Sequence, residues 1–379
     1  MPRERPKALV VTWASGGNLP PLLAAAGLLA SREFAVDVLA SSATRADAER
    51  RGLATHAYRR APEPDLSVPF EARAGRFLAQ AAGVELARDV HELAQGLAPD
   101  LLLADCMLPA ALAAGEAAGV RTASLVHFPY ALARSLMARG GGAWTTDRTT
   151  LDVTRRRLGL KPTASNLDAW ESPQLLLVTL PRWFDAPGEL PEHVVHAGPL
   201  GVAVRPPREP SQAAARALLA FSTTVMEGQR RLVANVCAAI EQAGIAGLLT
   251  LGPALDASVA DAVAGVEVAE WADHDEVMRS CDLVVTHGGL GTTLRALAHG
   301  RPLLLLPLGR DQNFNAARVE ELGAGLVLDA EASPDTITDA IIRLRAGPSF
   351  REGARQAAVA IAAERANDSA ADALSRLVI

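Results

Sequence analysis

Two segments in the second half of the chain carry residue types that could bind charged and polar groups. The first runs from Thr286 to Thr293 and directly follows an apolar stretch typical of a buried strand. A glycine-rich turn between a strand and a helix lets backbone N–H groups approach an anion, and the amino end of the helix adds partial positive charge. We therefore predict a phosphate site formed by His287, Gly288, Gly289, Gly291 and Thr292.

This turn differs from the two best-known phosphate-binding loops. No Gly-Lys-Ser or Gly-Lys-Thr follows it, so it is not a P-loop, and Leu294 stands where a dinucleotide-binding fingerprint has its third glycine. A turn that serves the fold alone is the alternative interpretation. The combination of His287, three glycines and two threonines favours the phosphate site.

The second segment, Pro307–Asn315, follows the next apolar strand candidate along the chain. Asp311 and Gln312 offer carboxylate and amide acceptors together with an amide donor, a set that suits sugar hydroxyls. The alternative is a cap for the helix that begins near Asn313. Beside a phosphate site, we favour the sugar interpretation.

Two residues in the first half could move a proton. Asp105 ends the strand candidate 100–104, and His127 ends the strand candidate 121–126. Histidine is the side chain whose ordinary pKa suits general base catalysis near neutral pH, and a carboxylate can also accept a proton. The structural alternatives are a helix cap for Asp105, ahead of the helix after Pro109, and a packed, non-catalytic ring for His127.

The elements that must position these residues alternate between short apolar runs and longer helical patterns, including a long helical pattern near 70–97. Several runs are apolar throughout, as parallel strands buried on both faces are. This alternation predicts an α/β fold with parallel sheets. The strand candidates are 8–13, 34–40, 53–58, 100–104, 121–126, 174–179, 246–251, 266–269, 282–286, 302–307 and 325–329.

A proline-rich stretch divides the chain into two halves. Residues 198–210 contain four prolines and two glycines, the best linker candidate in the sequence. We expect one domain over 1–205, a second over 212–350 and a linker at about 198–211. A length of 379 residues fits two domains.

Composition excludes several classes of protein. The net charge of −6 argues against a nucleic-acid binder. The three cysteines are widely spaced and form neither a disulfide framework nor a metal-binding pair. No apolar run approaches the roughly 18 residues of a membrane span, and the first residues do not read as a signal peptide. We therefore expect a cytoplasmic protein with no membrane span, no metal and no nucleic-acid partner.

Together the two motif-bearing segments resemble the sugar-nucleotide signature of the family 1 glycosyltransferases, which have the GT-B fold. The likeness is greatest to bacterial natural-product members that decorate antibiotics, and it extends to Phe221–Thr224 and Glu270–His274. The C-terminal half matches almost throughout, the N-terminal half mainly in layout. The resemblance implies two facing Rossmann-like domains with parallel sheets and a cleft between them. It also implies that a C-terminal helix, about 352–379, packs back on the first domain.

The resemblance also implies roles in donor binding. His287 and the turn Gly288–Thr292 would hold the diphosphate of a TDP- or UDP-sugar, with Ser222 and Thr223 nearby, and Asp311 and Gln312 would hold the sugar. Trp271 would stack on the base; core packing is the alternative for this residue. The proline that relatives carry two residues after this tryptophan is Asp273 here. The nucleotide sugar is a substrate, and no cofactor or metal is implied.

The chain departs from the family at the catalytic base. Most relatives carry a Gly-His pair at the first strand–helix turn, whereas this chain has Asn18 there. An amide side chain can position an acceptor but cannot take its proton. We expect Asp105 or His127 to assist proton removal in a one-step, inverting transfer to a small-molecule natural product, an antibiotic, polyketide or aromatic aglycone.

Two alternatives share the predicted fold. A sugar-nucleotide 2-epimerase-like enzyme would bind the same donor without an acceptor. A non-catalytic, sugar-nucleotide-binding partner of a transferase would explain Asn18 in place of the base. A homodimer is compatible with the glycosyltransferase hypothesis and with both alternatives.

Overall fold

The computed structural model describes residues 5–13, 16–63, 70–139, 146–203, 216–260, 264–365 and 368–378. The chain forms two compact units. The first comprises residues 1–66, 71–201 and 367–379; the second comprises 67–70 and 202–366. Residues 204–215, most of the predicted linker, lie outside the described residues.

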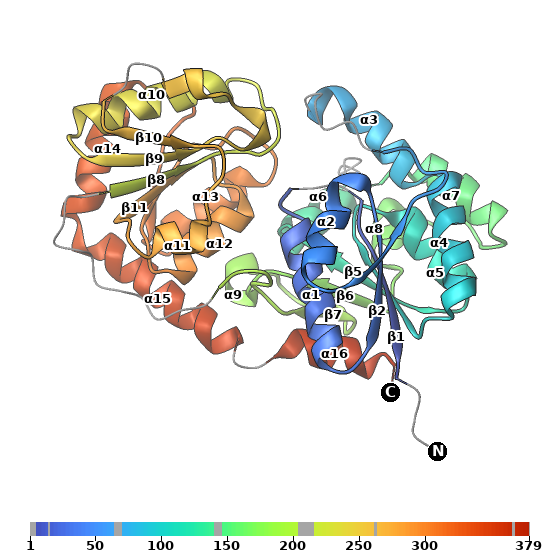
Figure 1. Ribbon diagram of the computed structural model, residues 1–379. Helices are drawn as coiled ribbons and strands as arrows, with labels where there is room; N and C mark the ends of the chain where they lie inside the picture. The colour runs from blue at the N-terminus through green and yellow to red at the C-terminus, as the bar shows by residue number, and fades with distance from the viewer. Residues whose placement is uncertain are drawn as a thin grey trace. The chain divides into compact units, whose positions relative to one another are not determined.

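The described residues of the first unit form a seven-stranded sheet in which every pairing is parallel. The strand order is β3-β2-β1-β4-β5-β6-β7 (Figure 1). In chain order the strands are β1 (Lys7–Val11), β2 (Ala35–Ala40), β3 (Ala54–Ala57), β4 (Leu101–Asp105), β5 (Arg121–Val126), β6 (Leu175–Val178) and β7 (Val194–His196).

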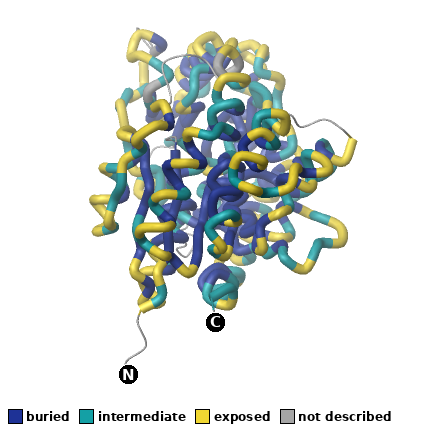
Figure 2. Tube along the Cα trace, turned by 90° about the vertical axis from the view of Figure 1, so that its right-hand side faces the viewer, coloured by how far each residue is buried: buried dark blue, intermediate teal, exposed yellow. Residues whose placement is uncertain are grey.

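Helices cover both faces of this sheet, which explains why its strands are apolar throughout. In β1, Ala8 and Val10 belong to one hydrophobic core and Leu9 and Val11 to another. Figure 2 shows buried strands in dark blue beside helices with exposed stretches. The helices are α1 (Leu19–Ser31), α2 (Ser42–Arg50), α3 (Phe70–Ala81), α4 (Val84–Leu97), α5 (Pro109–Ala117), α6 (Tyr130–Ala138), α7 (Arg148–Arg157), α8 (Asn166–Glu171) and α9 (Arg182–Asp185).

The described residues of the second unit form a six-stranded parallel sheet of order β10-β9-β8-β11-β12-β13. Its strands are β8 (Arg216–Ala220), β9 (Ala246–Thr250), β10 (Val266–Ala269), β11 (Leu283–Thr286), β12 (Leu303–Leu305) and β13 (Gly325–Val327). Its helices are α10 (Gln229–Gln242), α11 (His274–Met278), α12 (Leu290–Ala298), α13 (Gln312–Glu321), α14 (Pro334–Ala346) and α15 (Pro348–Arg365), with the 3-10 turns η1 (Gly252–Ala254) and η2 (Ala257–Ala260).

The C-terminal segment is divided between the two units. Helix α15 contacts α12 of the second unit, whereas α16 (Ser369–Arg376) contacts α1 of the first. The backbone at Asp368 is left-handed, with φ of 44°, and this turn separates the two helices. Of the single helix expected over 352–379, only the part from Ser369 onward therefore packs on the first unit. The α/β class with two parallel sheets is confirmed.

Candidate functional site

Each sheet has a switch point, where the strand order reverses, and the predicted site residues follow the strands at these points. In the first sheet the central pair is β1 and β4; in the second it is β8 and β11. Connections from such a pair leave in opposite directions, which opens a crevice at the carboxyl ends of the strands. Asp105 is the last residue of β4, and His287 directly follows β11.

Asp105 is 1% exposed and both of its carboxylate oxygens are engaged. Oδ2 accepts a hydrogen bond of 2.7 Å from Asn18 Nδ2, and Oδ1 accepts one of 2.8 Å from the backbone N–H of Met107. The N-cap residue of α5 is Leu108, so the Asp105 carboxylate is not the cap of that helix. The amide of Asn18 holds this buried carboxylate in place.

His127 lies beside Asp105 because β4 and β5 are neighbours, with Asp105 opposite Leu125 in the register. His127 Nδ1 is 3.6 Å from Asp105 Oδ1, and the imidazole side chain is 19% exposed. This distance is too long for a hydrogen bond, but catalytic contacts of this kind often shorten when substrate binds. The ring can therefore be oriented through Nδ1 while Nε2 serves as a proton acceptor.

Cys106, one of the three cysteines to which the sequence analysis gave no role, is a neighbour of this pair. Its Sγ is 3.9 Å from His127 Nδ1, and the side chain is 1% exposed. Burial raises the pKa of the thiol well above its ordinary value, and the charge of Asp105 adds to the shift. Its position directly after Asp105, at the end of a buried strand, is the signal in the sequence that could have identified it.

In the second unit, the segment after β8 is held by a buried glutamine. The backbone N–H of Ser222 donates to Gln229 Oε1 at 3.2 Å, and Gln229 Nε2 donates to the Ser222 carbonyl at 3.3 Å. Ser222 Oγ accepts a hydrogen bond of 3.0 Å from the N–H of Thr224. Thr223 is exposed, so its hydroxyl is the one in this segment that is open to a ligand.

Two glycines of the turn after β11 are required by the geometry. Gly288 has φ of +86°, in the region that favours glycine. A Cβ on Gly289 would lie 2.6 Å from His287 Nε2. Gly289 is the N-cap of α12, where the first N–H groups of a helix have no intrahelical partner and can bind an anion. Thr292, in the first turn of α12, is half-buried.

His287 is buried, and its burial lowers its pKa to about 4; the charge of Arg310 acts in the same direction, while a backbone hydrogen bond involving Ala220 opposes it. The imidazole is therefore neutral near pH 7, with one N–H donor and one lone pair. Nδ1 lies 3.4 Å from Thr286 Oγ1. A neutral ring can donate a hydrogen bond to a phosphate oxygen without adding a charge to the buried strand end.

The Asp311 loop is tied to the phosphate turn by Asn315, a residue that no sequence prediction singled out. Asn315 Nδ2 donates to the Gly288 carbonyl at 2.9 Å and to Asp311 Oδ2 at 2.9 Å. Asp311 is the N-cap residue of α13 but makes no side-chain capping bond. The four-residue spacing from Asp311 to Asn315 at a helix start is the signal that could have revealed this contact.

Gln312 is more enclosed than its expected role at a sugar requires. Its side chain is buried, and Oε1 accepts a hydrogen bond of 2.7 Å from the N–H of Leu308. Nε2 lies 3.4 Å from Met226 Sδ. The amide thus shapes the loop that leads to Asp311, and only its second N–H remains for a ligand.

Trp271 is 80% exposed, so the core-packing alternative for this residue is wrong. It follows β10 at a carboxyl strand end, and Asp273, two residues later, caps α11 by accepting a hydrogen bond of 2.9 Å from the N–H of Asp275. The indole therefore offers an open face for stacking, on a loop that a helix cap anchors.

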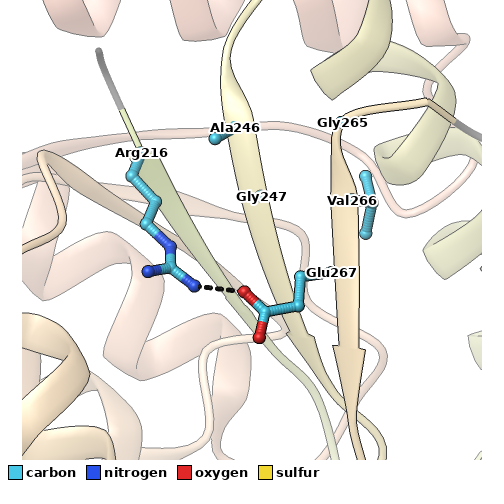
Figure 3. Close-up of a pocket in the computed structure, with 6 residues that line it drawn as sticks. All are labelled: Arg216, Ala246, Gly247, Gly265, Val266 and Glu267. Carbon is cyan, nitrogen blue, oxygen red and sulfur yellow. Dashed lines mark hydrogen bonds and ion pairs between the residues drawn. The ribbon is translucent and has the colours of Figure 1, made fainter.

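A shallow pocket in the second unit lies away from these residues. Figure 3 shows Arg216, Gly247 and Val266 at the amino ends of β8, β9 and β10, with Arg216 paired to Glu267 at 2.7 Å. Ligands of open parallel sheets bind at the opposite, carboxyl edge. We assign no role to this pocket.

None of the helices in the described ranges is long and apolar enough to cross a membrane.

Comparison with known proteins agrees with the C-terminal motifs. Residues 242–377 match the family described as "Erythromycin biosynthesis protein CIII-like, C-terminal domain". The chain is 42% identical over 93 residues to the elloramycin glycosyltransferase of Streptomyces olivaceus, covering 24% of this chain and 23% of that one. It is 32% identical over 194 residues to a zeaxanthin glucosyltransferase of Pseudescherichia vulneris, covering 50% and 46%. The matches thus span less than half of these relatives.

Similarity in structure extends over nearly the whole chain. The spinosyn forosaminyltransferase superposes with a TM-score of 0.80 at 18% identity, covering 99% of this chain and 100% of that one. The calicheamicin glycosyltransferase superposes with a TM-score of 0.78 at 21% identity, covering 99% and 98%. At such identities the likeness establishes the fold.

Proposed function

Because residues 242–377 match the erythromycin CIII-like C-terminal domain family and the chain has the GT-B fold, we propose that this protein is an inverting glycosyltransferase. The donor is a TDP- or UDP-sugar and the acceptor a small-molecule natural product. The observation that carries the proposal is the second-unit arrangement in which Asn315 joins the turn after β11 to Asp311.

The donor binds to the second unit. Its diphosphate lies on Gly288–Thr292, where the amino end of α12 and the neutral His287 offer N–H donors, so that no metal is required to balance its charge. The sugar hydroxyls contact the Asp311 carboxylate and the remaining N–H of Gln312. Ser222 and Thr223 lie beside the phosphates, and the exposed face of Trp271 stacks on the base.

The acceptor binds to the first unit, with its nucleophilic O–H or N–H at His127 Nε2. The acceptor atom attacks the anomeric carbon, its proton passes to His127, and the bond from the anomeric carbon to the phosphate oxygen breaks. The electron pair leaves with the nucleoside diphosphate, which α12 stabilises. Asp105 orients His127 and balances the imidazolium, as a carboxylate does for other catalytic histidines, and Asn18 holds Asp105.

The acceptor class is proposed from relatives whose names state their substrates or products. One relative is named an elloramycin glycosyltransferase and another a zeaxanthin glucosyltransferase. We extend this to an antibiotic, polyketide or aromatic aglycone as acceptor here. The cytoplasmic location and the homodimer remain predictions.

A nucleotide-release screen tests the proposal. TDP- and UDP-sugars are incubated with polyketide and aromatic acceptors, and the wild type should release nucleoside diphosphate only when an acceptor is present. His127→Ala and Asp105→Asn should each lower kcat by about 10²–10⁴-fold with the donor KM little changed. Full kcat in both variants contradicts the assignment of the base.

The two alternatives give different results in the same screen. Conversion of a UDP-sugar to an epimer without any acceptor identifies an epimerase. Donor binding without turnover on any acceptor identifies a non-catalytic partner, which the replacement of the usual histidine by Asn18 favours.

A further inference from the structure

Three side chains of different chemistry converge at the carboxyl ends of β4 and β5. The ligand atoms of Asp105, Cys106 and His127 all lie within 4.8 Å of one another. His127 Nδ1 is 3.6 Å from Asp105 Oδ1 and 3.9 Å from Cys106 Sγ. We propose that these three atoms form a binding site for a thiophilic divalent cation, of which Zn²⁺ is the best-fitting example, and that this cation inhibits the enzyme.

The separations are close to those of a tetrahedral zinc site. Metal–ligand bonds of about 2.0–2.3 Å place tetrahedral ligand atoms roughly 3.3–3.6 Å apart. The distance of 3.6 Å from His127 Nδ1 to Asp105 Oδ1 lies at the upper end of this range, and the 3.9 Å to Cys106 Sγ exceeds it by about 0.3 Å. One carboxylate, one thiolate and one imidazole are also ligand types that zinc accepts, and three protein ligands leave a fourth position for water.

The surroundings hold the ligands in place. Asn18 Nδ2 donates to Asp105 Oδ2, and the N–H of Met107 donates to Oδ1, the oxygen that lies 3.6 Å from His127 Nδ1. Partners of this kind orient metal-binding carboxylates. Asp105 and Cys106 are each 1% exposed, whereas the His127 side chain is 19% exposed, so the cation enters from the His127 side.

A second observation concerns the buried indole of Trp170. Its Nε1 has no hydrogen-bond acceptor among the described residues, and its ring stacks on that of Phe128, the residue that directly follows His127. Metal binding replaces the thiol proton, which leaves to solvent as the sulfur–metal bond forms.

Inhibition follows from the chemistry of imidazole, and this part rests on the proposed function. A neutral imidazole that binds a metal through the Nδ1 lone pair carries its hydrogen on Nε2. Nε2 then has no lone pair with which to accept the acceptor proton. The same cation also occupies the Asp105 oxygen that faces the ring, so the Asp105–His127 pair is lost as a base.

Cobalt titration of the full chain tests the site without any catalysis. Co²⁺ bound to a thiolate gives a charge-transfer band in the near ultraviolet. The metal-free wild type should develop this band at a ratio of one cobalt per chain. Cys106→Ala should lose it, whereas Cys237→Ala, which removes another buried free cysteine, should keep it.

A second variant guards against misfolding at the buried position. His127→Gln alters the more exposed ligand and should weaken Co²⁺ binding at least about 100-fold, since even partners outside the coordination shell contribute about 10–100-fold. Thermal unfolding of each variant checks that it is folded. No band in the wild type, or an undiminished band in folded Cys106→Ala, overturns the site.

Measurements of turnover test the inhibitory part of the proposal. Zn²⁺ should inhibit wild-type nucleotide release, a chelator should restore it, and Cys106→Ala should resist inhibition while keeping its basal rate. If cobalt binds but zinc does not inhibit, the inhibitory part of the proposal is overturned. If no acceptor supports turnover, the proposed function fails, and the cobalt band still decides the site.

Discussion

At the scale of single residues, Asn315 joins two separate segments that we propose to bind the donor. Its buried Nδ2 donates to both the Gly288 carbonyl and Asp311 Oδ2, so the turn after β11 and the Asp311 carboxylate share one anchor. Because Asn315 acts on the donor only through these two groups, it is a positioning residue. Its substitution should therefore raise the donor KM more than it lowers kcat.

A pair of substitutions at this position tests the anchor. Asn315→Ala removes the amide, whereas Asn315→Asp places a second carboxylate about 3 Å from Asp311. Two carboxylates this close share a proton, so the pKa of one is raised. The donor KM of Asn315→Asp should rise at least about tenfold at pH 8 and partly recover near pH 5.5, where a shared proton restores a donor.

The alanine variant is the control for this pH dependence. It should have a raised donor KM that changes with pH no more than that of the wild type. Identical pH profiles for the two variants would show that Asn315 does not act on Asp311.

The lowered pKa of His287 predicts that the free energy of unfolding depends on pH. Its pKa is lowered from 6.5 to about 4, so between these values the unfolded chain binds a proton that the folded chain does not. Stability is therefore retained above about pH 6.5 and declines as the pH falls toward 4, by an amount of order 3 kcal/mol.

Denaturant unfolding of the wild type and of His287→Asn measures this contribution. As the pH is lowered from 7 to 4.5, the unfolding free energy of the wild type should fall relative to that of His287→Asn. A constant difference across this range would mean that the His287 ring is not buried in its neutral form.

At the scale of elements, the amino end of α12 is the feature that the donor should use. Gly291 is exposed in the first turn of this helix, and a Cβ added there would meet no atom within 4 Å. The fold therefore tolerates Gly291→Ala, and replacing a helical glycine by alanine stabilises by about 0.5–1 kcal/mol. A diphosphate on the turn would, however, contact the added methyl group.

Gly291→Ala should accordingly keep or raise the thermal stability while weakening donor binding at least about tenfold, as calorimetric titration with a nucleoside diphosphate would measure. Gly27→Ala is the matched control: Gly27 is an exposed glycine of α1 whose added Cβ also meets nothing within 4 Å. If Gly291→Ala kept the donor affinity of the wild type, the diphosphate would not bind at this end of α12.

The helices of the first unit show where periodicity fails to mark an element's end. The helical pattern near 70–97 is two helices, α3 and α4, separated at Gly83, which is the N-cap of α4. A Cβ at this position would lie 3.0 Å from the Ala79 carbonyl. The apolar spacing continues across the break, so this spacing alone does not mark where α3 ends.

At the scale of the whole molecule, the chain crosses between units twice, and the second crossing ends in α16. Leu374 of α16 is fully buried in the core that α1 and the first sheet form. Leu374→Ala should lower the stability of the first unit by about 2–5 kcal/mol, because it removes buried methyl groups and leaves a cavity. Nucleotide binding by the second unit should not change.

Thermal unfolding and nucleotide titration of the same variant measure both effects. Arg32→Ala is the control, since it removes only the exposed ion pairs with Asp368 and Asp372 and should have a much smaller effect. If Leu374→Ala were as stable as the wild type, the first unit would not need helix α16 for its stability.

The sequence by itself determined the α/β class, most strands and the glycine-rich turn after β11. Each depends on local chemistry: uninterrupted apolar runs for strands buried on both faces, and glycines where the backbone has positive φ or meets a side chain. The tertiary structure alone decided which strand ends are neighbours. The parallel pairing of β4 with β5 joins Asp105 and Cys106 to His127, and the contact of Asn315 with Gly288 crosses 27 residues. Such contacts depend on strand order and register, which residue spacing does not encode.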